Sequence, residues 1–192
     1  MAVPSLERAE ELLASSGLPE GIVRHSRGVA RVAAEAARIV HGSGVPVDAG
    51  LVEVAALLHD IDKPETRGSL AHGVVAASRM VELGWEELAM PIASHPVTAL
   101  LDEERYPRGW PSVIVSVADR HVAQDFLTTD ERIDDMALRH PDYREQLELA
   151  RRQAHALEAE LAEVAGLGVE QLVGRLRAAW AAWASGAAGA IG

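Results

Sequence analysis

Hydrophobic residues recur every three or four positions along most of this chain, with polar and charged residues between them. A repeat near 3.6 residues is typical of an amphipathic helix that buries one face. The pattern is clearest at residues 20–41, where one helical face carries Ile22, His25, Val29, Val32, Ala36 and Ile39. The segment VIVSVA (113–118) has a β-like composition, but its neighbours are compatible with a helix. The sequence therefore predicts an all-α fold, with helices at residues 5–16, 20–41, 49–60, 70–83, 86–94, 111–127, 130–139, 142–166 and 169–185.

Glycine and proline residues mark the breaks between these helices. Gly17 and Pro19 end the first helix, and three further segments are expected to be loops: HGSGVPVD (41–48), PETRGS (64–69) and LDEERYPRGWP (101–111).

Trp180 and Trp183 are three residues apart, a spacing more typical of a core or an interface than of a ligand site. We expect a single domain with an N-terminal helix (1–19), a helical core (20–127), C-terminal helices packed on the core or at a homodimer interface (128–186) and a flexible tail (187–192).

Composition and charge narrow the classes of function. The formal net charge of -11 argues against binding to a nucleic acid duplex or an anionic membrane, although a metal ion can reverse the field locally for a small phosphorylated substrate. The absence of Cys excludes disulfides, iron–sulfur clusters and thiol catalysis. The acidic N-terminus does not resemble a signal peptide, and no apolar run approaches about 18 residues, so a cytoplasmic location is expected.

Ligand-type side chains follow or interrupt several apolar runs. His59 and Asp60 come directly after the run AALL, and a buried carboxylate costs several kcal/mol unless it is paired or binds a cation. Imidazole and carboxylate are good ligands for divalent ions. One inward histidine is more often an ordinary core residue, but five segments share this property through His25, His59–Asp60, His72, His95 and Asp119. A common metal site is the better interpretation.

The remaining candidates are weaker. Asp125 is the alternative to Asp119, but no comparable apolar run leads into it. Four other histidines are not expected to bind metal, because each ends a helix, points away from Asp119 on the same helix, precedes proline or lies among charged positions: His41, His121, His140 and His155, respectively.

The order H…HD…H…H…D, formed by the residues above, resembles the HD-domain superfamily of metal-dependent phosphohydrolases. The fragments RHSRGVARVAAEAA, AALLHDIDK, AHGVVAA and SVAD carry the resemblance, which covers roughly residues 20–125. The branch most similar to this chain is the small bacterial hydrolases that cleave symmetrical dinucleoside tetraphosphates. The chain departs from that branch at Pro96 and Val97 and again after Asp119.

The resemblance implies a ligand set and a reaction. The first divalent ion would be held by His25, His59, Asp60 and Asp119, and Asp60 would bridge to a second ion held by His72 and His95. Iron, manganese, cobalt, nickel, magnesium and zinc are all candidates for one or two ions. The expected reaction is cleavage of a phosphate ester or anhydride, preferably of a nucleotide, by a metal-bound hydroxide. Asp60 and Lys63 would act in catalysis, Asp62 would orient a ligand histidine, and the substrate would contact Lys63, Arg67 and Arg120.

Three alternatives remain open at this point. A His and Asp ligand set also suits the two irons of HD-type oxygenases. A helical domain that senses a nucleotide or a metal, and signals through its C-terminal helices, would need no catalysis. A helical protein with incidental histidines is the third.

Overall fold

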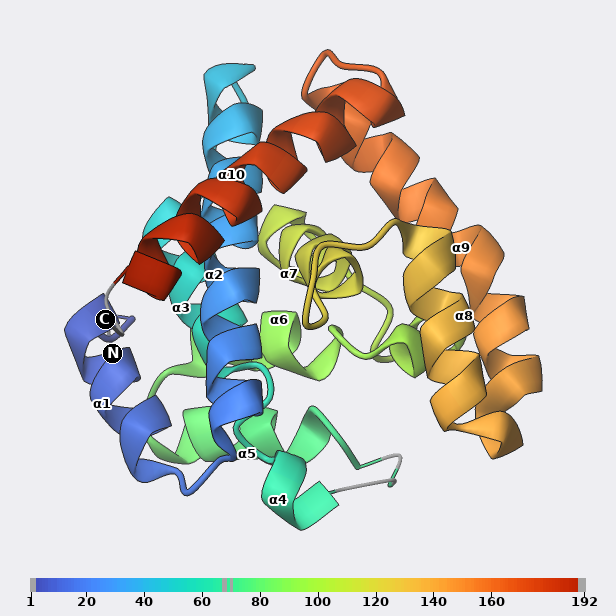
Figure 1. Ribbon diagram of the computed structural model, residues 1–192. Coiled ribbons are helices and arrows are strands. Elements are labelled where there is room, and N and C mark those ends of the chain that lie inside the picture. Colours follow the sequence, from blue (N-terminus) through green and yellow to red (C-terminus); the bar gives the residue numbers. More distant parts are fainter. Residues whose placement is uncertain (1–2, 67–68, 70, 190–192) are drawn as a thin grey trace.

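The computed structural model describes residues 3–66, 69 and 71–189, and over these residues the protein is all-α (Figure 1). An isolated bridge between Val122 and Phe126 is its only β-type pairing in the described ranges. The elements are α1 (Leu6–Ser15), α2 (Glu20–Gly42), α3 (Ala49–Leu58), α4 (Lys63–Thr66), α5 (Val74–Glu82), η1 (Glu86–Leu88), α6 (Ala89–Ala93), η2 (Val97–Leu101), α7 (Trp110–His121), α8 (Thr129–Arg139), η3 (Pro141–Tyr143), α9 (Arg144–Val164) and α10 (Val169–Gly189).

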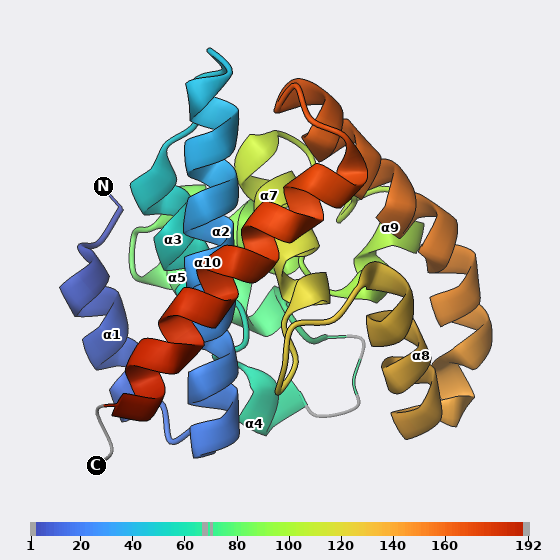
Figure 2. The ribbon, with the colours of Figure 1, turned by 45° about the horizontal axis from the view of Figure 1, so that its top comes forward.

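Helix α2 lies at the centre of the fold and packs against α3, α7 and α10. Its buried face is rich in alanine, including Ala33 and Ala37, and α3 contributes Ala55 and Ala56 to the same core. Small side chains let helix axes approach closely, which brings the ends of these helices near one another. Helix α10 crosses over α2, and α8 and α9 form a helical hairpin beside α7 (Figures 1 and 2).

Several predicted helix ends are wrong. The predicted helix 49–60 ends at Leu58, so His59 is its C-cap and Asp60 lies in the following turn. The predicted helix 111–127 ends at His121, because the chain then turns back to pair Val122 with Phe126. Helix α4 overlaps the start of the predicted loop 64–69, and η2 forms between the predicted helix 86–94 and the predicted loop 101–111.

Gly73 explains why the predicted helix 70–83 begins only at Val74. Its φ of 82° is in the left-handed region, and a Cβ there would lie 3.1 Å from the carbonyl oxygen of Ile92. The chain therefore reaches α5 through a turn that passes very close to α6, and His72 lies in that turn. None of the described helices combines the length and the apolar character needed to cross a bilayer.

The crossing of α10 over α2 depends on Gly28. A Cβ at this position would lie 3.1 Å from both the Trp183 ring and Cγ1 of Val122. We expect Gly28→Val to lower the free energy of unfolding by about 1–3 kcal/mol through overpacking, as measured by urea denaturation. Gly174→Val is the matched control, since nothing lies within 4 Å of a Cβ there, and it should leave stability nearly unchanged. Equal stability of the two variants would contradict this account of the contact.

Candidate metal centre

Three histidines are oriented through their Nδ1 atoms. Nδ1 of His59 lies 2.7 Å from the carbonyl oxygen of Ala56, and Nδ1 of His95 lies 2.6 Å from that of Ile92. Nδ1 of His72 lies 2.8 Å from Oδ1 of Asp62. Because carbonyl and carboxylate oxygens only accept, Nδ1 is the donor in each case. Nε2 of each ring is left to face the centre of the fold, where it can bind a metal when unprotonated.

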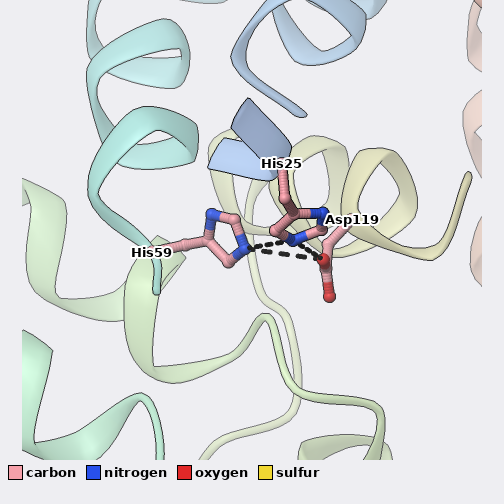
Figure 3. A group of neighbouring side chains, drawn as sticks. All are labelled: His25, His59 and Asp119. Atoms are coloured by element: carbon pink, nitrogen blue, oxygen red, sulfur yellow. Dashed lines mark hydrogen bonds and ion pairs between the residues drawn. The ribbon is translucent and has the colours of Figure 1, made fainter. Parts of the chain in front are cut away.

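One group of ligand atoms gathers between α2, α3 and α7 (Figure 3). Nε2 of His25 lies 3.2 Å from Nε2 of His59 and 3.1 Å from Oδ1 of Asp119. Nε2 of His59 lies 3.4 Å from the same oxygen of Asp119. Oδ2 of Asp60 lies 3.4 Å from both Nε2 atoms. Four residues from three separate parts of the chain thus place four donor atoms around one point.

The second oxygen of Asp60 faces a different pair of histidines. Oδ1 lies 3.2 Å from Nε2 of His72 and 3.6 Å from Nε2 of His95. The two Nε2 atoms are 3.0 Å apart. His59, Asp60 and His95 also lie close enough to share an ion. Asp60 therefore lies between two groups of donors, with one carboxylate oxygen toward each.

The spacing of these atoms fits a divalent ion. Bonds of about 2.0–2.2 Å place neighbouring ligand atoms about 3.0–3.6 Å apart in four- to six-coordinate sites. The distances between ligand atoms within the two groups, 3.0–3.6 Å, fall within this range. Oδ1 of Asp60 and Oδ1 of Asp119 are buried and have no hydrogen-bond partner. Two unsatisfied carboxylate oxygens are costly without a cation, so the residues present fit a metal centre.

The electrostatics of the cluster also favour a cation. Burial alone would raise the pKa of Asp60, but His59 and Lys63 outweigh it and hold this pKa well below its usual range. Burial also opposes ionisation of Asp119, yet His25 and His59 hold its pKa well below the usual range. Both side chains are therefore carboxylates at neutral pH.

The histidines divide into two kinds. Burial lowers the pKa of His25, and it lowers that of His95 to about 4. Burial has the same tendency at His59 and His72, but the carboxylates outweigh it and raise their pKa values to about 10 and about 8. Protons on these two rings balance the carboxylates in the metal-free protein, and a divalent ion would supply that positive charge instead.

The centre is closed on one side and open on the other. The side chains of His59, Asp60 and His95 are at most 2 % exposed, whereas those of His25, Asp119 and His72 are 10 %, 15 % and 21 % exposed. Lys63 lies at the edge of the opening, with its ammonium on Oδ2 of Asp60. A substrate could reach the cluster from this side.

The other predicted contacts with substrate are distributed differently. Arg120 is 2 % exposed and donates to Oγ of Ser116 inside the fold, so its position does not support the expected direct contact with substrate. Arg67 lies outside the described residues. Asp125 is exposed and is not among the residues that could hold a metal ion together.

Two residues at the centre's periphery have roles that local sequence does not reveal. His121 is fully buried, with Nε2 2.7 Å from Oε1 of Glu158 on α9. The sequence indicates only that His121 is not a ligand, because its partner is 37 positions away. Glu158 itself lies in a helix where charged residues are common, and no local pattern distinguishes it.

Asp62 links His72 to the start of α5. Oδ1 accepts from the His72 ring, and Oδ2 accepts from the backbone N–H groups of Gly73 and Ala76 at 2.8 and 3.1 Å. This carboxylate therefore caps α5 and fixes the tautomer of His72 at once.

We expect Asp62→Asn to weaken binding of the second metal ion by about 10- to 100-fold, because the amide can present a donor to Nδ1 and move the ring proton to Nε2. Isothermal titration with Mn²⁺ measures the loss, and long-range ¹H–¹⁵N NMR reports the tautomer of His72. Glu65→Gln, which alters only an exposed ion pair with Arg79, is the control. Unchanged binding at both sites in Asp62→Asn would show that the carboxylate does not orient His72.

Comparison with known proteins agrees with the geometry. An uncharacterized protein of Methanocaldococcus jannaschii is 38 % identical over 93 residues, which cover 48 % of this chain and 54 % of that relative. The match thus spans about half the length of the curated relative. The comparison with solved structures gives no significant match. A family model described as the HD domain matches residues 22–163, from α2 into α9, and the chain belongs to the HD domain family.

Proposed function

We propose that this protein is a metal-dependent phosphohydrolase that cleaves a phosphate ester or anhydride bond, with a nucleotide as the preferred substrate. Membership of the HD domain family supports the reaction class. The observation that carries the proposal is the position of Asp60, whose two oxygens each face a separate pair of histidine Nε2 atoms at 3.2–3.6 Å. A carboxylate in this position is suited to bridge two ions.

The position of each ligand residue indicates which of the two ions it would hold. His25, His59, Asp60 and Asp119 would hold one ion, and His72 and His95 would hold the second together with Asp60. A bound divalent ion would lower the pKa of its water and offset the negative charge that develops on the phosphoryl oxygens. The carbonyl groups of Ala56 and Ile92 keep the Nε2 atoms of His59 and His95 directed at the centre.

Lys63 would receive the substrate. Its side chain is 35 % exposed and its ammonium already lies beside Asp60, so a short rotation would direct it to a phosphate oxygen at the opening. The protein carries a net charge of -11, and an anionic substrate needs a local positive field to approach. The metal ions and Lys63 together would supply that field.

The proposal predicts both the metal content and the hydrolytic activity of the protein. Protein purified without added metal should contain about two divalent ions per chain and should release phosphate or nucleotide in a screen with Mn²⁺, Fe²⁺, Co²⁺, Ni²⁺ and Mg²⁺. The screen should include mononucleotides, symmetrical dinucleoside tetraphosphates and p-nitrophenyl phosphate. Asp60→Asn should lose most of the metal and reduce hydrolysis more than about 100-fold, since ligand loss exceeds the effect of outer partners.

Asp125→Asn is the matched control, because this carboxylate is close in sequence to Asp119 but is exposed and is not one of the expected metal ligands. It should leave metal content and hydrolysis unchanged. Two irons with no hydrolysis of any ester would favour an HD-type oxygenase instead. Ligand binding without turnover would favour a sensor, and a metal-free protein would contradict the proposal.

The proposal also predicts that bound metal raises the stability of the fold. Because the donors lie on α2 and α7 and in the segments after α3, before α5 and after α6, metal binding should stabilise the whole fold by mass action. Metal at about 100 times its Kd adds about 2.7 kcal/mol, which corresponds to about 5–10 °C in Tm for a chain of this size. Differential scanning calorimetry with and without EDTA measures this shift. An identical Tm in verified metal-free and metal-loaded samples would rule out the stabilising role.

A further inference from the structure

A buried carboxylate of the C-terminal half contacts the end of α7, the helix that carries Asp119. Glu158 of α9 is 5 % exposed, and a charge at such a site is costly unless it is compensated. Oε1 of Glu158 lies 2.7 Å from Nε2 of His121 on α7 and accepts from Oγ1 of Thr129 on α8 at 3.1 Å. Glu158 therefore joins three helices at one point.

His121 ends α7 and lies two residues after Asp119 on that helix. Nδ1 of His121 donates to the carbonyl oxygen of Leu127 at 2.8 Å, and the N–H of Leu127 donates back to the carbonyl oxygen of His121 at 2.8 Å. The His121 ring also stacks on Phe126, with centroids 5.0 Å apart and planes at 2°. The end of α7 is thus held between Glu158 and the loop that follows it.

Helix α10 packs against this loop. The guanidinium of Arg177 lies 4.7 Å above the ring of Phe126, and Trp180 packs against the same ring at 6.4 Å. Helix α9 therefore contacts His121 directly through Glu158, and α10 contacts it indirectly through Phe126.

Arg120 supplies a second link between Glu158 and Asp119. Its guanidinium is buried, one nitrogen donates to Ser116, and another has no hydrogen-bond partner. Asp119 and Glu158 are the two carboxylates whose charges stabilise the guanidinium.

We propose that Glu158 is a positioning residue for the metal ligand Asp119, acting through His121 and Arg120. This inference rests on the proposed function, because the position of Asp119 matters through the ion that it would bind. It assigns to α9 a role in setting metal affinity that goes beyond packing against the core.

Co²⁺ is the probe for the test, since its visible absorption reports both affinity and coordination geometry. We expect Glu158→Gln, which keeps the size of the side chain and loses its charge, to weaken Co²⁺ binding by about 10- to 100-fold and to change the visible spectrum of the bound ion. Glu160→Gln, on an exposed face of the same helix, should bind Co²⁺ as the unaltered protein does. His121→Phe keeps a ring for stacking on Phe126 and provides a second variant that should show the same change.

Thr129→Val separates positioning from packing, because it removes the hydrogen bond that Glu158 accepts from Oγ1 of Thr129 and leaves the contact with His121 in place. It should lower Tm without changing the Co²⁺ spectrum. The inference would be overturned if Glu158→Gln folds and binds Co²⁺ with the original spectrum, or if Thr129→Val alters the spectrum equally. Absence of Co²⁺ binding in the unaltered protein would instead contradict the proposed function on which the inference depends.

Discussion

The charge of two carboxylates inside a helical core is the constraint on which the rest of the structure depends. Asp60 is fully buried and the side chain of Asp119 is 15 % exposed, and each has a buried oxygen without a hydrogen-bond partner. Isolated carboxylates in such surroundings would cost many kcal/mol. The protein places four imidazole rings and the ammonium of Lys63 around them, an arrangement that makes a divalent ion the natural occupant.

The fold provides this arrangement mostly through helix ends. His59 and His95 each follow a helix, and each donates from Nδ1 to the carbonyl group three residues earlier. Carbonyl groups in the last turn of a helix lack partners within the helix, so this hydrogen bond satisfies the backbone and orients the ring together. The alanine-rich contact of α2 with α3 then lets His25 approach His59 to 3.2 Å between ring nitrogens.

The sequence predicts the all-α class because the 3.6-residue period depends only on which side chains face the core. It also identifies the residues that the structure brings together at the centre, since buried ligand-type side chains stand out against apolar runs. Helix ends are less predictable: the end of α7 at His121 is set by the return of the chain to Phe126, and the start of α5 by the close approach of Gly73 to α6. The burial of Arg120 and the pairing of His121 with Glu158 depend on contacts between distant segments, for which single positions carry no signal.

Anomalous diffraction from crystals of metal-loaded protein, recorded at the absorption edge of the added ion, is the most direct test of the account. We predict an anomalous peak about 2.0–2.2 Å from Nε2 of His25, Nε2 of His59, Oδ2 of Asp60 and Oδ1 of Asp119, with a second peak beside Oδ1 of Asp60, His72 and His95. A peak at other residues, or none in crystals with demonstrated metal uptake, would contradict the central claim that these side chains form a metal centre.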